Sequence, residues 1–318
     1  MKRFKKLLVY TGSSPDETLI NRSVVLAMEN DASLTWIDVI KPIPRSLRFI
    51  TGGTDPKELE RLLVEEHRRK LVELAGDLFD DEVPIEVVVR TGDPATEIIR
   101  EVVDHGHDLV IKTADNFGTS EQLFGGVARS LIRMCPCAVL LLKSAVHGDF
   151  DQVVVPLDVE AVDESHQSLN RSIAEIATEI ARADDASLHL IAVWDFPMEA
   201  PFRQRSGDAE VDHAIEQHEA ALRAKIHQLF PKTDHSIRTP EVHLRRGSAA
   251  KAIIELVQEV QADLLVMGTV CRTGLAGFLI GNTAETVLVD ATCSVLALKP
   301  DGFVSPISEA VEAETSVL

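Results

Sequence analysis

The sequence is poor in cysteine and has no long apolar run. Its four cysteines are too few and too scattered for a disulfide framework in a chain of 318 residues. No apolar run approaches the roughly 18 residues of a membrane-spanning helix, and the run after Lys6 falls short of the roughly 7 to 15 residues of a signal-peptide core. We therefore expect a cytoplasmic protein with no membrane partner.

Basic residues are also scarce relative to acidic ones. The chain has 32 lysines and arginines against 51 acidic residues, which gives a formal net charge of -19. This field repels phosphate backbones and disfavours a nucleic-acid partner. The length suggests about two domains, and a hydrophobic content of 45% is ample for two cores.

The cysteines and histidines show no metal-binding or redox pattern. Cys135 and Cys137 directly precede an apolar stretch at 138–143, where small apolar residues favour core packing. The eleven histidines are dispersed, and no His-x-x-x-His pair is present. We expect no metal site and no catalytic residues among these groups.

Two copies of one unit make up most of the chain. Segments of the first half recur in the second, in the same order and at nearly constant separation: 21–39 with 170–193, 90–99 with 245–254, 107–113 with 262–268 and 137–143 with 293–299. We predict domains over residues 1–146 and 151–300, followed by an acidic tail over 301–318.

Each copy alternates short apolar strands with helices. The strand-like runs are apolar throughout, which indicates burial on both faces of a parallel sheet. The long segments 56–79 and 209–230 carry apolar residues at helical spacing, as expected of helices that cover a sheet. We predict an α/β fold of two tandem doubly wound parallel-sheet domains. We also predict an internal pseudo-dimer, because pairing 137–143 with 293–299 would remove two apolar edge strands.

The stretch "VMGTVCRTGLAGFLIGNTAETV", residues 266–287, is a candidate anion site. It runs from a predicted strand through a glycine-rich loop into a helix, and free backbone N–H groups in such a loop can hold an anion. It is neither a Walker P-loop nor a G-x-G-x-x-G dinucleotide motif. Its place at the carboxyl end of the fourth strand of copy two is where an open parallel sheet binds ligands.

The chain resembles the universal stress protein family, in its tandem-domain type. The residues that carry the resemblance are "GTVCRTGLAGFLIGNTAETV", "CSVLALKPD", "GHDLVIK" and "RMCPCAVLLLK". It implies an adenine nucleotide alpha-hydrolase-like fold with strand order 3-2-1-4-5, adenine-nucleotide binding in some members, and a role in surviving stress. In nucleotide-binding members the fourth strand leads into Gly-x2-Gly-x9-Gly-Ser/Thr, which holds the phosphates, while an Asp and a Val hold the ribose and adenine.

Carried over to copy two, the resemblance implies a nucleotide site with two departures. Its residues are Asp158, Val193, Met267, Gly268, Arg272, Gly281, Asn282 and Thr283. Cys271 stands at the second motif glycine and adds a Cβ where backbone should approach phosphate closely. Asn282 replaces the hydroxyl residue.

Copy one has lost more of the motif. Lys112 and Thr113 end its fourth strand, Thr11 or Gly12 stands near the place of the aspartate, and only Gly125 and Gly126 match the loop. We expect no nucleotide site there.

The sequence favours a non-catalytic stress-response protein with a weak or vestigial pocket for ATP or AMP in domain two. It identifies no cofactor beyond these nucleotides and leaves open whether whole chains form a homodimer. One alternative is an enzyme that hydrolyses ATP slowly with Asp158, Gly268, Arg272 and Gly281. Another is a carrier of an apolar small molecule beneath the long helices at 56–79 and 209–230.

Overall fold

The chain divides into two compact units. The computed structural model describes residues 4–12, 15–44, 55–78, 83–114, 125–143, 149–230, 238–269 and 280–308. The first unit holds the described residues up to 143 together with 303–308, and the second holds 149–302. Residues 303–308 of the predicted tail thus group with the first unit, whereas 301 and 302 group with the second.

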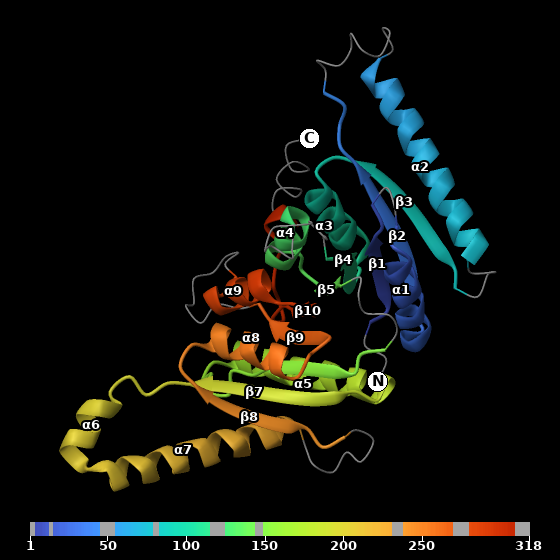
Figure 1. Cartoon of the computed structure of the whole chain (residues 1–318). Coiled ribbons are helices and arrows are strands. Elements are labelled where there is room, and N and C mark those ends of the chain that lie inside the picture. The colour runs from blue at the N-terminus through green and yellow to red at the C-terminus, as the bar shows by residue number, and fades with distance from the viewer. Residues whose placement is uncertain are drawn as a thin grey trace. The chain divides into compact units, whose positions relative to one another are not determined.

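The first unit alternates strands and helices along the chain (Figure 1). Its elements are β1 (Lys6–Tyr10), α1 (Glu17–Asn30), β2 (Ser33–Ile40), α2 (Pro56–Leu78), β3 (Ile85–Thr91), α3 (Pro94–His105), β4 (Leu109–Thr113), α4 (Gly126–Met134) and β5 (Ala138–Leu142).

The second unit repeats this order with one additional helix among its described residues. Its elements are β6 (Gln152–Pro156), α5 (Glu164–Asp184), β7 (Ser187–Trp194), α6 (Glu199–Ser206), α7 (Asp208–Leu229), β8 (Glu241–Arg246), α8 (Ala249–Glu259), β9 (Leu264–Gly268), α9 (Asn282–Asp290) and β10 (Ser294–Leu298). The additional helix, α6, was not predicted, because its sequence has no apolar stripe and it buries no residue.

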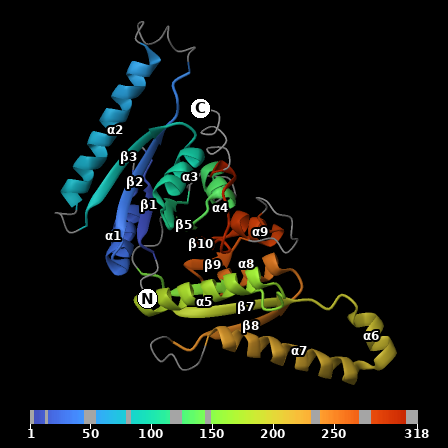
Figure 2. The same cartoon turned by 180° about the vertical axis from the view of Figure 1, so that it is seen from behind.

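Both sheets have the predicted topology. The strand orders are β3-β2-β1-β4-β5 and β8-β7-β6-β9-β10, and the neighbours within each unit pair in parallel. Helices cover both faces of the second sheet. In Figure 1, α8, which packs with α9, lies in front of this sheet, and in Figure 2, α5, which packs with α7, lies in front of it. The tandem doubly wound fold is confirmed, whereas pairing of 137–143 with 293–299 stays a prediction.

The central strands form the cores. Leu7, Leu8 and Val9 of β1 are 0% exposed, as are Val153 and Val154 of β6. Successive strand residues point to opposite faces, so burial of consecutive residues means that both faces are covered. The continuous apolar runs therefore predicted the layers correctly.

The long helices are less buried than their patterns suggested. On α2, Leu71 is buried, yet Leu62 and Val72 are 47% and 52% exposed. On α7 the buried residues are Val211, Leu222 and Ile226. None of the described helices is long and apolar enough to cross a membrane.

Equivalent aspartates fix the start of the first strand in each unit. The Asp108 carboxylate accepts hydrogen bonds from the backbone N–H groups of Lys5 and Lys6 at 2.7 and 3.0 Å. Asp263 accepts from the N–H groups of Asp151 and Gln152 at 2.7 and 3.2 Å. These contacts join the beginnings of the first and fourth strands, so the repeat preserves hydrogen bonding as well as apolar residues.

The described cysteines form no disulfide. Cys135 and Cys293 are buried, and the Cys137 sulfur lies 3.4 Å from that of Cys135, a hydrogen-bonding distance. This burial is consistent with the predicted core packing of the Cys-Pro-Cys segment. Cys271 lies outside the described residues.

Candidate functional site

A cavity of about 450 Å³ opens at the carboxyl ends of β6, β7 and β9 in the second unit. Strand order reverses between β6 and β9, the place where parallel sheets of this kind bind ligands. The volume falls within the range of about 300–1,000 Å³ typical of small-molecule sites.

The structure brings together seven of the eight predicted site residues. Those lining the cavity are Asp158, Val193, Met267, Gly268, Gly281, Asn282 and Thr283. The eighth, Arg272, lies outside the described residues, as does Cys271. The strand ends and the start of α9 thus converge as the motif spacing implied.

Asp158 follows β6 and is held by Asn170 of α5. The Asn170 side chain donates to the carbonyl of Asp158 at 2.8 Å and accepts from its N–H at 3.4 Å. Both residues line the cavity. This reciprocal pair fixes the backbone at Asp158, so the loop presents a defined polar wall.

The N-terminus of α9 provides hydrogen-bond donors at the cavity. Gly281 is the N-cap residue and makes no side-chain capping hydrogen bond, so the first N–H groups of the helix have no internal acceptor. Residues 281–284 line the cavity. Such a helix start attracts anions through its N–H groups and its dipole.

Gly268 ends β9 where no side chain fits without rearrangement. A Cβ at this position would lie 2.5 Å from Cδ2 of Leu169 and 3.5 Å from Cδ1 of Ile173, both on α5. Leu169 and Ile173 also line the cavity. Glycine here therefore allows α5 to approach β9 closely and keeps the cavity open.

Part of the cavity wall is apolar. Ile191 and Val193 come from β7, and Ala249 and Ile253 come from α8. Apolar side chains suit a flat heteroaromatic ring, while the polar groups of the lining suit a sugar and phosphate.

His166 is a cavity residue that the sequence did not identify. Its Nδ1 lies 2.7 Å from Oδ1 of Asp163, the N-cap residue of α5. Its Nε2 is buried with no hydrogen-bond partner among the described residues. Hydrogen bonds from His166 hold the pKa of Asp163 below its usual range. Only the N-cap pattern before α5 could have drawn attention to this pair.

The charge of the described lining is negative. Asp158, Glu160 and Asp195 line the cavity, and this part of the lining contains no lysine or arginine. Three carboxylates oppose a phosphate group and favour a ligand that presents hydroxyl donors there. Among the described lining residues, hydrogen bonds to phosphate can come from the backbone N–H groups of α9 and from the side chains of Asn282 and Thr283.

The equivalent place in the first unit has different residues. Thr11 N–H donates to the carbonyl of Ile37, and Leu157 N–H donates to that of Ile191. The two contacts are equivalent, so Gly12 is the first unit's counterpart of Asp158. Strand register likewise matches Thr113 to Gly268.

Lys112, the first unit's equivalent of Met267, is 3% exposed, and its ammonium donates to the carbonyl of Thr113 at 2.7 Å. The first unit therefore lacks both the aspartate and the close glycine of the second.

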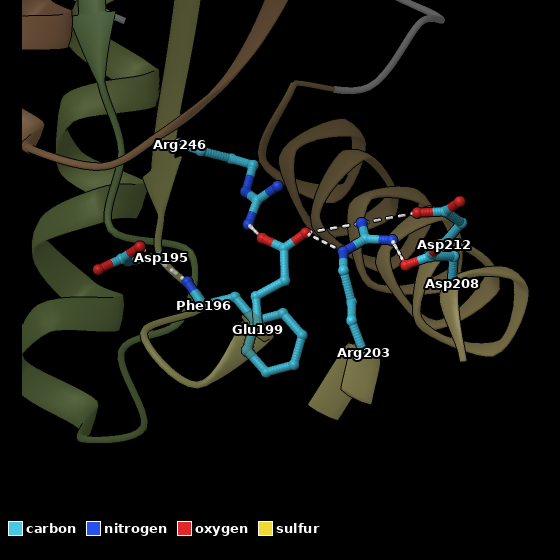
Figure 3. A network of polar contacts seen from close by, with 7 residues as sticks. All are labelled: Asp195, Phe196, Glu199, Arg203, Asp208, Asp212 and Arg246. Atoms are coloured by element: carbon cyan, nitrogen blue, oxygen red, sulfur yellow. Dashed lines mark hydrogen bonds and ion pairs between the residues drawn. The ribbon is translucent and has the colours of Figure 1, made fainter. Parts of the chain in front are cut away.

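A network of ion pairs borders the cavity on the side of α6 (Figure 3). Arg246, at the end of β8, and Arg203 of α6 both contact Glu199. Arg203 also lies 2.7 Å from Asp212 and 3.2 Å from Asp208 at the start of α7. Hydrogen bonds from Arg246 and Arg203 lower the pKa of Glu199. The network joins α6 to both neighbouring elements.

The same network reaches the cavity rim. Trp194 and Asp195 line the cavity just before α6, and the Arg246 guanidinium carbon lies 4.9 Å from the Trp194 ring centroid. The ring of His218 on α7 lies 4.7 Å from the same tryptophan. These contacts fix the end of β7, which forms one edge of the site.

A second cavity, of about 530 Å³, lies between α5, α7 and the loop after β6. Most of its lining residues are polar or charged, including Gln167, Arg171, Glu175 and Lys225. This lining does not favour an acyl chain, so the apolar-ligand alternative gains no support beneath α7.

Comparison with known proteins places the chain in a family. A profile of the universal stress protein family matches residues 3–143 and 150–299. Proteins named universal stress protein E from Photorhabdus laumondii and Escherichia coli K12 are each 26% identical, the first over 98% of this chain and 100% of its own length, the second over 95% of both.

Solved structures show the same relationship. A Pseudomonas aeruginosa UCBPP-PA14 protein assigned to this family is 25% identical, with a TM-score of 0.74 and coverage of 99% of both chains. A universal stress protein from Archaeoglobus fulgidus shares the fold, with 19% identity, a TM-score of 0.55 and coverage of 92% of this chain and 98% of its own. The chain belongs to the universal stress protein family and carries the family's domain in two tandem copies.

Proposed function

We propose that this protein is a non-catalytic, cytoplasmic stress-response protein that binds an adenine nucleotide weakly in its second unit. Family membership supports the stress-response role. The observation that supports nucleotide binding is the cavity at the carboxyl ends of β6, β7 and β9, which the first residues of α9 help to line.

Each part of a nucleotide has a suitable wall. The apolar surface formed by Val193, Ile191 and Ile253 suits adenine, Asp158 can accept hydrogen bonds from ribose hydroxyls, and the N–H groups after Gly281 suit phosphate. The family resemblance assigns the same roles to Asp158, Val193 and Gly281, so geometry and motif agree.

We expect weak binding for two reasons. The described lining has three carboxylates and no cation to offset phosphate charge. In the loop, Cys271 and Asn282 replace the glycine and the hydroxyl residue of the nucleotide-binding pattern. AMP carries less charge than ATP and should suffer less from the carboxylates.

Calorimetric titration with ATP and AMP tests this proposal. We expect Cys271→Gly to restore close backbone approach and Asn282→Ser to add a hydroxyl donor, each tightening ATP binding. One charge-assisted hydrogen bond contributes about 1.5–3 kcal/mol, so each change should be worth about tenfold or more in affinity. A double variant that still ignores ATP would contradict the proposal, and micromolar binding by the wild type would contradict the weakness assigned to it.

Slow ATP hydrolysis is a second candidate, because the Asp163–His166 pair resembles an oriented general base. His166 lines the cavity, and its ring nitrogen opposite the Asp163 contact has no hydrogen-bond partner among the described residues, which leaves that nitrogen available to accept a proton. Phosphate release from MgATP by wild type and His166→Asn separates the candidates. Release that disappears in the variant, with ATP binding retained, would favour the enzyme, whereas no release from either supports a binding protein.

A further inference from the structure

Three side chains with metal-ligand chemistry meet on one face of the second sheet. His189 lies on β7, and Glu241 and His243 lie on β8. Strand register places His189 beside Glu241, and His243 is two residues further along the same strand. Residues two apart on a strand share a face, so all three point to the same side. They lie near the amino ends of these strands, opposite the nucleotide cavity, which lies at the carboxyl ends.

The ligand atoms are close enough to share one ion. His189 Nδ1 is 3.3 Å from His243 Nε2. The Glu241 carboxylate oxygens lie 3.7 Å from each of these nitrogens. Zinc–nitrogen bonds of about 2.0–2.1 Å in a tetrahedron place two nitrogens about 3.3 Å apart. The imidazole separation therefore matches a tetrahedral ion without movement of the strands.

A neighbouring amide fixes which nitrogen of His189 faces the cluster. Gln152 Oε1 lies 2.9 Å from His189 Nε2. Because a carbonyl oxygen only accepts, Nε2 carries the proton and Nδ1 presents its lone pair to His243 and Glu241. Metal-ligating histidines are oriented by such hydrogen bonds through the ring nitrogen that does not bind the metal.

The surroundings favour neutral imidazoles and leave the carboxylate accessible. Burial lowers the pKa of both histidines, and their side chains are 11% and 17% exposed, whereas that of Glu241 is 67% exposed. Arg245, further along β8, is occupied by Glu259 at 3.1 Å. The two charges act on the pKa of His243 in opposite directions, and burial remains the largest cause of its shift.

The first unit does not repeat this arrangement. Register matches His189 to Thr35, Glu241 to Glu86 and His243 to Val88. Only the carboxylate is common to both units, so the two imidazole donors are specific to the second.

We propose that His189, Glu241 and His243 bind a divalent transition-metal ion of the zinc class, with a fourth position open to water. Two imidazoles and a carboxylate suit zinc, cobalt, nickel and copper better than magnesium or calcium, which prefer oxygen ligands. The site is independent of the nucleotide proposal, because it shares no residue with that cavity.

Cobalt(II) absorption of the metal-stripped full-length protein tests the site. We expect tetrahedral visible bands that saturate near one equivalent, lack thiolate charge transfer, and disappear when zinc is added. Glu241→Gln and His243→Gln should weaken binding at least tenfold, while His213→Gln, at an exposed histidine of α7, should leave it unchanged. Gln152→Ala should weaken it by about tenfold to hundredfold through loss of the orienting bond.

Circular dichroism of each variant shows whether it folds, and Glu241→Gln alters an exposed side chain on which the core does not depend. The proposal is overturned if the wild type gives no tetrahedral bands at millimolar cobalt, if thiolate bands show that cysteines hold the ion, or if folded Glu241→Gln and His243→Gln bind as tightly as the wild type.

Discussion

The first and second units align strand by strand and yet place different residues at the carboxyl ends of those strands. Gly12 and Thr113 stand where the second unit has Asp158 and Gly268. Buried apolar residues and the aspartates that fix the first strands are common to both. The shared residues maintain the fold, and the differing ones decide whether a site exists.

The largest expected effect comes from moving a first-unit residue into the second. Gly268→Thr adds a Cβ that would lie 2.5 Å from Leu169, so Leu169 must shift at the cavity wall. We expect ATP affinity to fall tenfold or more, and overpacking to cost about 1–3 kcal/mol of unfolding free energy. Calorimetric titration and urea unfolding measure the two effects.

The reciprocal change, Thr113→Gly, is the matched control. It alters the first unit, which lacks the aspartate, and should leave ATP affinity unchanged. If nucleotide binding survives Gly268→Thr but weakens with Thr113→Gly, the nucleotide site lies in the first unit and the assignment to the second unit is wrong.

The aspartates that fix the first strands offer a second comparison. Asp108 accepts from the backbone of two lysines, whereas Asp263 accepts beside the like charge of Asp151, and burial raises the pKa of Asp263. We expect Asp108→Asn to cost about 1–3 kcal/mol in urea unfolding and Asp263→Asn to cost less. Equal costs, or a larger cost for Asp263→Asn, would contradict this ranking.

The two-domain organisation and the order of strands and helices along the chain could be predicted from the sequence, because the repeat and the apolar runs can be read directly from it. The family resemblance pointed to Asp158, Gly268 and Gly281, and all three line the cavity, because each stands at or near the end of a strand or the start of a helix. It could not find His166, whose position depends on how α5 packs against the strand ends.

The other missed features depend on tertiary structure. The cluster of His189, Glu241 and His243 depends on strand register, which joins residues far apart in the sequence. Helix α6 escaped prediction because charged contacts hold it rather than an apolar stripe.

His107 should make stability depend on pH through the first unit. It is 7% exposed, and burial lowers its pKa; its counterpart after α8 is Ala262. As pH falls, the unfolded chain therefore takes up the proton before the folded chain does. The free energy of unfolding should begin to decrease once the pH is below about 6.5, the ordinary histidine pKa, and should decrease further until the folded state is also protonated. Above that pH the contribution should be constant.

Urea unfolding of wild type and His107→Ala between pH 5 and 8 measures this effect. The variant should show a shallower decline. Some slope should remain, because burial also lowers the pKa of His189 and His243 in the second unit. The charges of Glu101, His105 and Lys6 also influence the pKa of His107. An identical slope in both proteins would therefore mean that these charges offset the effect of burial on that pKa.

The smallest expected effect concerns α6, for which the first unit has no counterpart among its described residues. Glu199→Gln weakens the contacts of Arg246 and Arg203 with α6 (Figure 3). Because exposed ion pairs contribute little to global stability, we expect an almost unchanged melting temperature and faster amide hydrogen exchange at 199–206. Glu66→Gln on α2, which removes an exposed pair with Lys70 at 2.7 Å, should change neither. Unchanged exchange at 199–206 in Glu199→Gln would mean that stacking of Phe196 on Phe202, at 5.6 Å between ring centroids, holds this helix instead of the ion pairs.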